Sequence, residues 1–231
     1  MTTDVRTAPA PSETPARSAG SLLLPIAGGA LIAGSLLWTA GLLTSPPQDS
    51  MADADYIAAL ARDEGRTALS ALLLHYGNIA LGLGWLAAPA LVRGRRGRIP
   101  AVVGALMTVL GLISVAGLVL FDFWTGAIGR DLPAGTAGSL FASVNSSAGV
   151  AIVGTVTLLG LLGPFVAYAG LARAGITGWW LFAPAVAAFA ASAAVPFSPL
   201  AHGAFALVGA VPVVVVGLRM LARNRAERSA A

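Results

Sequence analysis

The stretch Arg93-Gly94-Arg95-Arg96-Gly97-Arg98 decides how this chain is laid out, because it puts four arginines between two long apolar runs. The flanking runs, 69–92 and 99–121, are each long enough to cross a bilayer as a helix, which takes about 20 residues. Short basic turns stay on the cytoplasmic side of a membrane. Once this turn is placed there, the side of every other loop follows.

The composition is that of a membrane protein. Of the 231 residues, 57% are hydrophobic and only 10% are charged, whereas a soluble domain carries about 25% charged residues. That is too little charge for a surface facing water, so most of the surface must face lipid. The chain has no cysteine, which excludes disulfides, thiolate metal sites and cysteine nucleophiles.

The apolar runs predict an all-α integral membrane protein whose membrane domain, residues 21–221, is a bundle of six transmembrane helices. Prolines separate some of the runs, as in Ser45-Pro46-Pro47 and Pro196-Phe197-Ser198-Pro199, because proline cannot continue a helix. The predicted helices cover about 22–43, 69–92, 99–121, 147–171, 179–195 and 200–221.

The two ends of the chain differ from the apolar runs. Residues 1–20 are rich in proline, alanine, threonine and serine, a composition that cannot bury a core and predicts a disordered tail. Residues 222–231 form a basic, polar tail. The first run, 22–43, exceeds the about 7–15 residues of a signal-peptide core, which favours a helix that is retained.

Two long connections are expected to cap the outer end of the bundle. In 44–68, Ser50 followed by Asp53 is typical of a capping box, and it precedes apolar residues at helical spacing. This pattern predicts a short amphipathic helix that either lies on the membrane surface or packs on the neighbouring loop. The second connection, 124–145, contains four glycines and a proline and is predicted to be a loop.

The distribution of charge tests this layout. With the Arg93–Arg98 turn inside, eleven of the fourteen arginines fall on the cytoplasmic side, and only Arg62, Arg66 and Arg130 fall outside. Seven of the ten acidic residues also fall outside. This arginine asymmetry predicts that both termini are cytoplasmic in a plasma-membrane protein.

The Arg93–Arg98 turn is too short for a nucleic-acid-binding module, so we expect no nucleic-acid partner. All fourteen basic residues are arginine, which fits a GC-rich bacterial genome.

Small residues at four-residue spacing predict close helix packing. Gly29 with Ala33, and Ala30 with Gly34, form such pairs in the first predicted helix. Lipid gives helices no hydrophobic reason to associate, so small residues that allow close approach matter. The spacing does not identify the partner helix.

Three side chains that could bind a metal fall in the outer leaflet of this layout: His75, Asp122 and His202. Two imidazoles and one carboxylate with an open position for water are the pattern of catalytic zinc. If they converge, they predict a metal-dependent membrane hydrolase. Polar residues that could support such a site are Ser70, Asn78, Asn145 and Ser198.

The segment Ser198-Pro199-Leu200-Ala201-His202 resembles the Ser-x-x-x-His element of the alkaline ceramidase and adiponectin-receptor group of membrane hydrolases. The resemblance implies zinc-dependent hydrolysis of a lipid or amide. That group has seven helices and a His-x-x-x-His pair, whereas Ala206 occupies the position of the second histidine here. The resemblance covers five residues, and the chain is not assigned to that group.

Other interpretations remain open. The histidines could serve structure alone, and haem could lie between His75 and His202. No acidic or basic residue lies near the centre of a predicted helix, which disfavours ion-coupled transport. The leading hypothesis is a non-enzymatic membrane protein that is structural or binds a small molecule, a partner membrane protein or a second copy of itself.

Overall fold

The computed structural model describes residues 20–229, which are 86% helical and contain no strand. This confirms the predicted all-α class. Five helical segments are long and apolar enough to cross a membrane, and a shorter apolar segment covers Trp179–Ala194. The five segments are Leu23–Thr44, Glu64–Leu91, Arg98–Asp131, Ala148–Arg173 and Pro199–Arg223. The predicted tail before them lies outside the described residues, apart from Gly20.

The elements follow one another with short connections. In chain order they are α1 (Gly20–Thr44), α2 (Asp53–Arg62), α3 (Glu64–Ala87), the 3-10 helix η1 (Ala88–Leu91), α4 (Arg98–Val119), α5 (Phe121–Asp131), α6 (Ala134–Asn145), α7 (Ala148–Arg173), the 3-10 helix η2 (Trp179–Leu181), α8 (Phe182–Ala194) and α9 (Pro199–Ser229).

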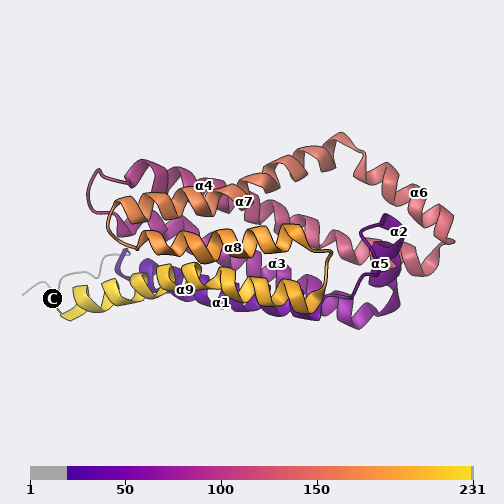
Figure 1. The fold of residues 1–231 in the computed structure, drawn as a ribbon, viewed down its shortest axis with the longest axis horizontal. Coiled ribbons are helices and arrows are strands. Elements are labelled where there is room, and N and C mark those ends of the chain that lie inside the picture. The colour runs from indigo at the N-terminus through magenta and orange to yellow at the C-terminus, as the bar shows by residue number, and fades with distance from the viewer. Residues whose placement is uncertain (1–19, 230–231) are drawn as a thin grey trace, which may run out of the picture.

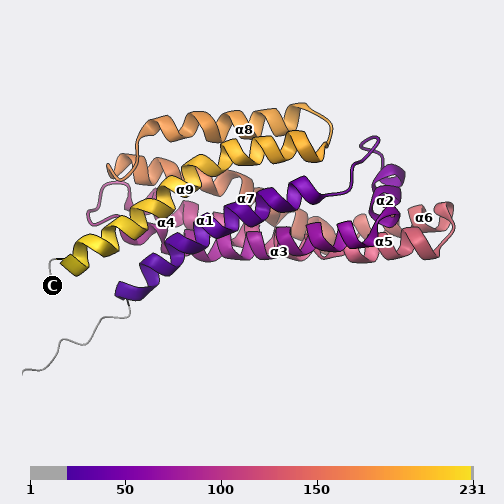
Figure 2. The ribbon, with the colours of Figure 1, turned by 90° about the horizontal axis from the view of Figure 1, so that it is seen from below.

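The long helices form an elongated bundle with two chemically different ends (Figure 1). We call the end that holds the Arg93–Arg98 turn, Arg173 and Arg223 the arginine end. The opposite end, which holds α2, α5 and α6, we call the acidic end. Both views show α8 running from the arginine end toward the acidic end, and α9 returning beside it (Figure 2).

Glycines bring α4 and α7 into backbone contact. A Cβ on Gly111 would lie 1.9 Å from the Gly160 nitrogen, and one on Gly104 would lie 2.1 Å from the Ala167 nitrogen. A Cβ on Gly170 would likewise lie 2.2 Å from the Ala101 nitrogen. Such contacts are possible only without side chains, so these glycines fix which two helices pair.

The arginine turn is held against the end of α7 in the same way. Gly97 has φ of 78°, a left-handed conformation that favours glycine. A Cβ there would also lie 2.2 Å from the Gly170 carbonyl oxygen. The Arg93–Arg98 turn therefore packs tightly against the end of α7.

The predicted second loop, 124–145, is wrong: this region is the helical hairpin of α5 and α6. Its apolar residues explain the difference. Ile128, Ala137 and Phe141 form a small buried cluster with Ile57 of α2. The glycines sit within helices whose inner faces are covered, so tertiary burial outweighs their low helix propensity.

Helix α2 packs on this hairpin, which is the second of the two placements considered for it. Ile57, Ala59 and Leu60 are buried. The predicted capping box is wrong in detail, because the helix begins after Ala52. The Ser50 hydroxyl instead accepts a bond from the Ala52 nitrogen at 3.1 Å and donates to the Asp55 carboxylate.

Three other helices differ from the predicted bounds. Helix α3 begins at Glu64, and its α-helical part stops at Ala87, because a 3-10 turn that contains Pro89 begins at Ala88. Helix α9 continues to Ser229, so most of the predicted basic tail is helical. Helix α8 covers only 13 residues, Phe182–Ala194, because Trp179–Leu181 form the 3-10 helix η2. None of the residues of α8 is buried.

Candidate functional site

A large cavity, of about 530 Å³, lies among α1, α3, α4, α7, α8 and α9. Its wall is mostly apolar, and the cavity is partly open to the surface. Along α9 it extends from His202 to Val213, which is about 16 Å at about 1.5 Å per residue. The space is therefore long and narrow, and its size is within the about 300–1,000 Å³ of small-molecule sites.

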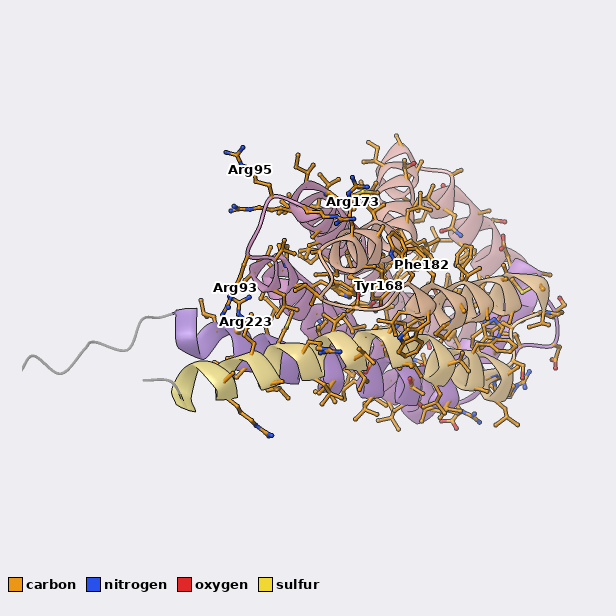
Figure 3. All side chains as sticks on the ribbon, turned by 60° about the vertical axis from the view of Figure 1, so that its left-hand side comes forward. Arg93, Arg95, Tyr168, Arg173, Phe182 and Arg223 are labelled. Atoms are coloured by element: carbon orange, nitrogen blue, oxygen red, sulfur yellow. The ribbon has the colours of Figure 1, made fainter. Side chains whose placement is uncertain are left out.

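Trp85 and Tyr168 form the cavity wall nearest the arginine end. Their rings meet edge to face, with centroids 5.1 Å apart and planes at 70°. Both residues are at most 2% exposed. Figure 3 shows Tyr168 inside the bundle near Phe182, whose ring centroid is 6.4 Å from its own.

The polar atoms of this aromatic pair have no hydrogen-bond partner in the part of the chain that the structure describes. Among residues 20–229, no group accepts a hydrogen bond from the Tyr168 hydroxyl or from the Trp85 indole N–H. Neither atom is fully occluded. A buried tyrosine or tryptophan normally has a hydrogen-bond partner for its polar atom, so this end of the cavity suits an oxygen atom on a ligand.

The middle of the cavity wall carries three more polar residues, Ser35, Asn78 and Thr108. The two hydroxyls bond to carbonyls of their own helices, at 2.9 Å and 2.7 Å. The Asn78 amide nitrogen donates to the Leu74 carbonyl at 2.8 Å, while its oxygen has no partner among the described residues. That oxygen is occluded, so a ligand reaches it only if the wall shifts.

At the acidic end, the cavity reaches His202 and Phe205 of α9. The His202 Nδ1 atom lies 3.2 Å from both the backbone nitrogen and the carbonyl oxygen of Ser198. Phe165 of α7 and Phe189 of α8 meet edge to face with centroids 6.0 Å apart. These two rings line the cavity where α7 and α8 face each other.

The three predicted metal ligands have separate partners. His75 Nδ1 donates to the Ala116 carbonyl at 2.8 Å. The Asp122 carboxylate accepts from the Tyr56 hydroxyl, and His202 bonds within the start of α9. Within residues 20–229, no three histidine or acidic side chains lie close enough to hold a metal ion. The structure therefore does not assemble the predicted metal site.

The polar residues predicted around that site are also dispersed. The Ser70 hydroxyl lies 2.7 Å from the Ser45 hydroxyl and donates to the Gly41 carbonyl at 2.9 Å. Asn145 is exposed at the end of α6, and Ser198 begins the turn that holds His202. Only Asn78 and His202 of the seven named residues line the large cavity.

Sequence reasoning missed Tyr168, Trp85 and the length of the cavity. One feature of the sequence did indicate Tyr168. Tyrosine and tryptophan in membrane helices concentrate at the lipid–water boundary, yet Tyr168 lies inside an apolar run with Pro164 one turn before it. An amphipathic ring placed there needs a partner for its polar tip.

Tyr56 provides a test of the packing at the acidic end. Burial, together with the charge and hydrogen bond of Asp122, raises the pKa of Tyr56 above its ordinary value of 10.0. At about pH 11, where free tyrosine is mostly ionised, Tyr56 should stay protonated in the native protein. Wild type and Tyr56→Phe should then show equal tyrosinate absorbance, and should differ by one tyrosine after unfolding in guanidinium chloride. A native difference of one tyrosine would contradict this packing.

Comparison of the chain with protein-family models, curated proteins and solved structures gives no match. The function must therefore be argued from the geometry above.

Proposed function

We propose that this protein binds an elongated, apolar small molecule that carries an oxygen atom at one end. The observation that carries the proposal is the cavity of about 530 Å³ lined by six helices, with Tyr168 and Trp85 at one end. An apolar wall binds the body of the molecule, and a few polar groups fix its orientation. The oxygen lies beside the aromatic pair, and the apolar part extends toward His202.

The bilayer is the natural source of such a molecule. Helix α8 has no buried residue, and its ring contacts with α7 are Phe165 with Phe189 and Tyr168 with Phe182. An apolar molecule dissolved in lipid can enter between these helices without crossing water. No reaction is part of the proposal, because the cavity holds neither an assembled metal site nor an acidic side chain.

We also propose that the chain crosses the plasma membrane six times and that both termini are cytoplasmic. Helix α7 ends at the arginine end, whereas α9 begins farther toward the acidic end and runs back to the arginine end (Figure 1). The chain must therefore return across the bundle through Trp179–Ala194. That segment is about 24 Å long as a helix, somewhat less than the about 30 Å of the hydrocarbon core. The extended residues before Pro199 supply the remainder.

The absence of cysteine makes this topology directly testable. Single cysteines at Gly94, Ser139 and Ala226 replace exposed residues and preserve all the arginines. A membrane-impermeant thiol reagent should label Ser139→Cys in intact cells. It should label Gly94→Cys and Ala226→Cys only after the membrane is opened. If Ala226→Cys is labelled in intact cells, the segment containing α8 does not cross.

Ligand binding can be tested with 1-undecanol and n-undecane, two probes that differ by one hydroxyl. Native mass spectrometry of the purified full chain should show one bound molecule of either probe at saturation. Tyr168→Phe should weaken 1-undecanol binding about 2–10-fold, because one neutral hydrogen bond contributes about 0.5–1.5 kcal/mol. Its affinity for n-undecane should not change.

Tyr76→Phe is the matched control, since Tyr76 is 58% exposed on α3 and does not line the cavity. It should leave both affinities unchanged. Absence of saturable binding for both probes would overturn the proposed function. Equal binding of 1-undecanol by wild type and Tyr168→Phe would overturn the orientation alone.

A further inference from the structure

A second pocket, of about 390 Å³, lies at the arginine end, away from the large cavity. It is built by segments that are distant in sequence: the end of η1 with the turn that follows, the turn after α7, and α9. Its charged wall is made by Arg93, Arg96 and Arg223, and its apolar wall includes Leu91 and Ile176. Figure 3 shows Arg93 and Arg223 close together at this end of the bundle.

Arg223 is held in place by the backbone of η1. Its Nη1 atom donates to the carbonyl oxygens of Ala90 and Leu91 at 2.8 and 2.9 Å. These carbonyls belong to the last residues of a helical turn, where the helix itself leaves acceptors unused. A guanidinium anchored in this way keeps a fixed orientation, which lowers the entropic cost of binding an anion.

The charge around this pocket is strongly positive. Residues 88–98, 173–178 and 219–229 contain nine arginines and one acidic residue, Glu227. Three of these arginines lie in the turn between η1 and α4, and a fourth, Arg98, is the first residue of α4. A concave site lined by one sign of charge concentrates ions of the opposite sign. The pocket therefore selects an anion.

The neighbouring tryptophans place the pocket at the level of lipid headgroups. Trp179 and Trp180 are each 60% exposed, and they follow directly on the turn that contributes Ala174 and Ile176 to the pocket. Exposed tryptophans in membrane proteins mark the boundary between hydrocarbon and water. The apolar floor next to the arginines suits the glycerol and first acyl carbons below a phosphate.

We propose that this pocket binds one anionic phospholipid, with the headgroup phosphate held by Arg93, Arg96 and Arg223. Guanidinium groups bind phosphate oxygens through paired N–H donors. The lipid contacts the turn before α4, the turn after α7, and α9. The site is separate from the large cavity and does not depend on its ligand.

The test uses full-length protein in a mild detergent and native mass spectrometry with added 1-palmitoyl-2-oleoyl-phosphatidylglycerol. Wild type should bind one molecule of this lipid at least tenfold more tightly than the phosphatidylcholine with the same chains. The double variant Arg93→Gln with Arg96→Gln should lose at least tenfold in phosphatidylglycerol affinity. Both measurements are made at one ionic strength, because surface charge interactions are screened by salt.

A second double variant, Arg95→Gln with Arg98→Gln, is the matched control. It removes the same charge from the same turn, and all four arginines are exposed, but neither Arg95 nor Arg98 lines the pocket. It should keep at least half of the wild-type affinity. Thermal unfolding of both double variants identifies any loss of folding.

Two results would overturn the proposal. Equal losses in the two double variants would mean that phosphatidylglycerol responds to the overall charge of the turn and not to a built pocket. Displacement of the lipid by millimolar inorganic phosphate would assign the pocket to a free anion. Persistence of the bound lipid in phosphate, together with selective loss in the Arg93 and Arg96 variant, supports a lipid site.

Discussion

Replacing Gly111 by valine is expected to disrupt the pairing of α4 and α7 and to give the largest loss of stability of any single change considered. The backbone of α7 occupies the position of the new side chain, since a Cβ at Gly111 would lie 1.9 Å from the Gly160 nitrogen and 2.2 Å from its Cα. No rotamer relieves a clash with the backbone, so the helices must move apart.

The loss should reach or exceed the upper part of the about 1–3 kcal/mol measured for overpacked cores. Separation of the helices also removes neighbouring contacts, such as the packing of Gly163 against the Thr108 backbone, where an added Cβ would lie 2.4 Å from the Thr108 nitrogen. Unfolding of the purified protein in increasing sodium dodecyl sulfate, followed by circular dichroism, measures the effect.

Gly117→Val is the control for this prediction. Gly117 belongs to the same helix, and a Cβ there would meet nothing within 4 Å. The change in helix propensity is the same in both variants, so the difference between them reports the α4–α7 contact. Similar stability of the two variants would show that the two backbones are not in contact.

Replacing Thr157 by tryptophan is expected to abolish probe binding in the large cavity. Thr157 lines the cavity from α7, where an indole would occupy space needed by the ligand. The affinity for 1-undecanol should fall at least tenfold, which corresponds to about 1.4 kcal/mol. Loss of n-undecane binding should accompany it, in contrast to Tyr168→Phe, because exclusion by volume does not depend on a hydroxyl.

Thr155 offers a close control on the same helix. Each threonine donates its hydroxyl to the carbonyl four residues earlier, at 2.8 Å for Thr155 and 3.0 Å for Thr157. Thr155 is exposed and does not line the cavity. Thr155→Trp should therefore bind both probes like wild type. If both tryptophan variants keep binding, the probes occupy a different place and the assignment of the cavity fails.

Local sequence patterns predicted some parts of the fold because those parts depend on neighbouring residues. An apolar run of about 20 residues indicates a membrane helix whatever surrounds it, and the structure has five such helices. The arginine-rich segments were predicted to share one side, and the turns before α4 and after α7 lie with the end of α9 at one end of the bundle (Figure 1). The side of the membrane that this end faces stays a prediction.

The hairpin of α5 and α6 shows where local patterns failed. Glycine and proline lower helix propensity, so the region 124–145 has the composition of a loop. It is helical because Ile128 and Phe141 are buried against Ile57 of α2. That contact joins residues more than 70 positions apart, and no local window contains it.

Helix pairing likewise needed the tertiary structure. The first predicted helix offered two pairs of small residues, and only the position of Gly34 is settled by contact: a Cβ there would lie 2.8 Å from the Leu81 nitrogen. Gly29 would meet nothing within 4 Å. Spacing shows that small residues share a helix face, but it does not show whether another helix covers that face.

The sequence by itself determined the class of the protein, the approximate membrane segments and the separation of arginine from acidic residues, because hydropathy and charge act residue by residue. Only the tertiary structure decided that His75, Asp122 and His202 have separate partners and that Trp85 and Tyr168 meet in one cavity. The physical reason is that a site depends on the lateral order and rotation of helices. Those are fixed by close contacts such as Gly111 with Gly160, which join residues far apart in the chain.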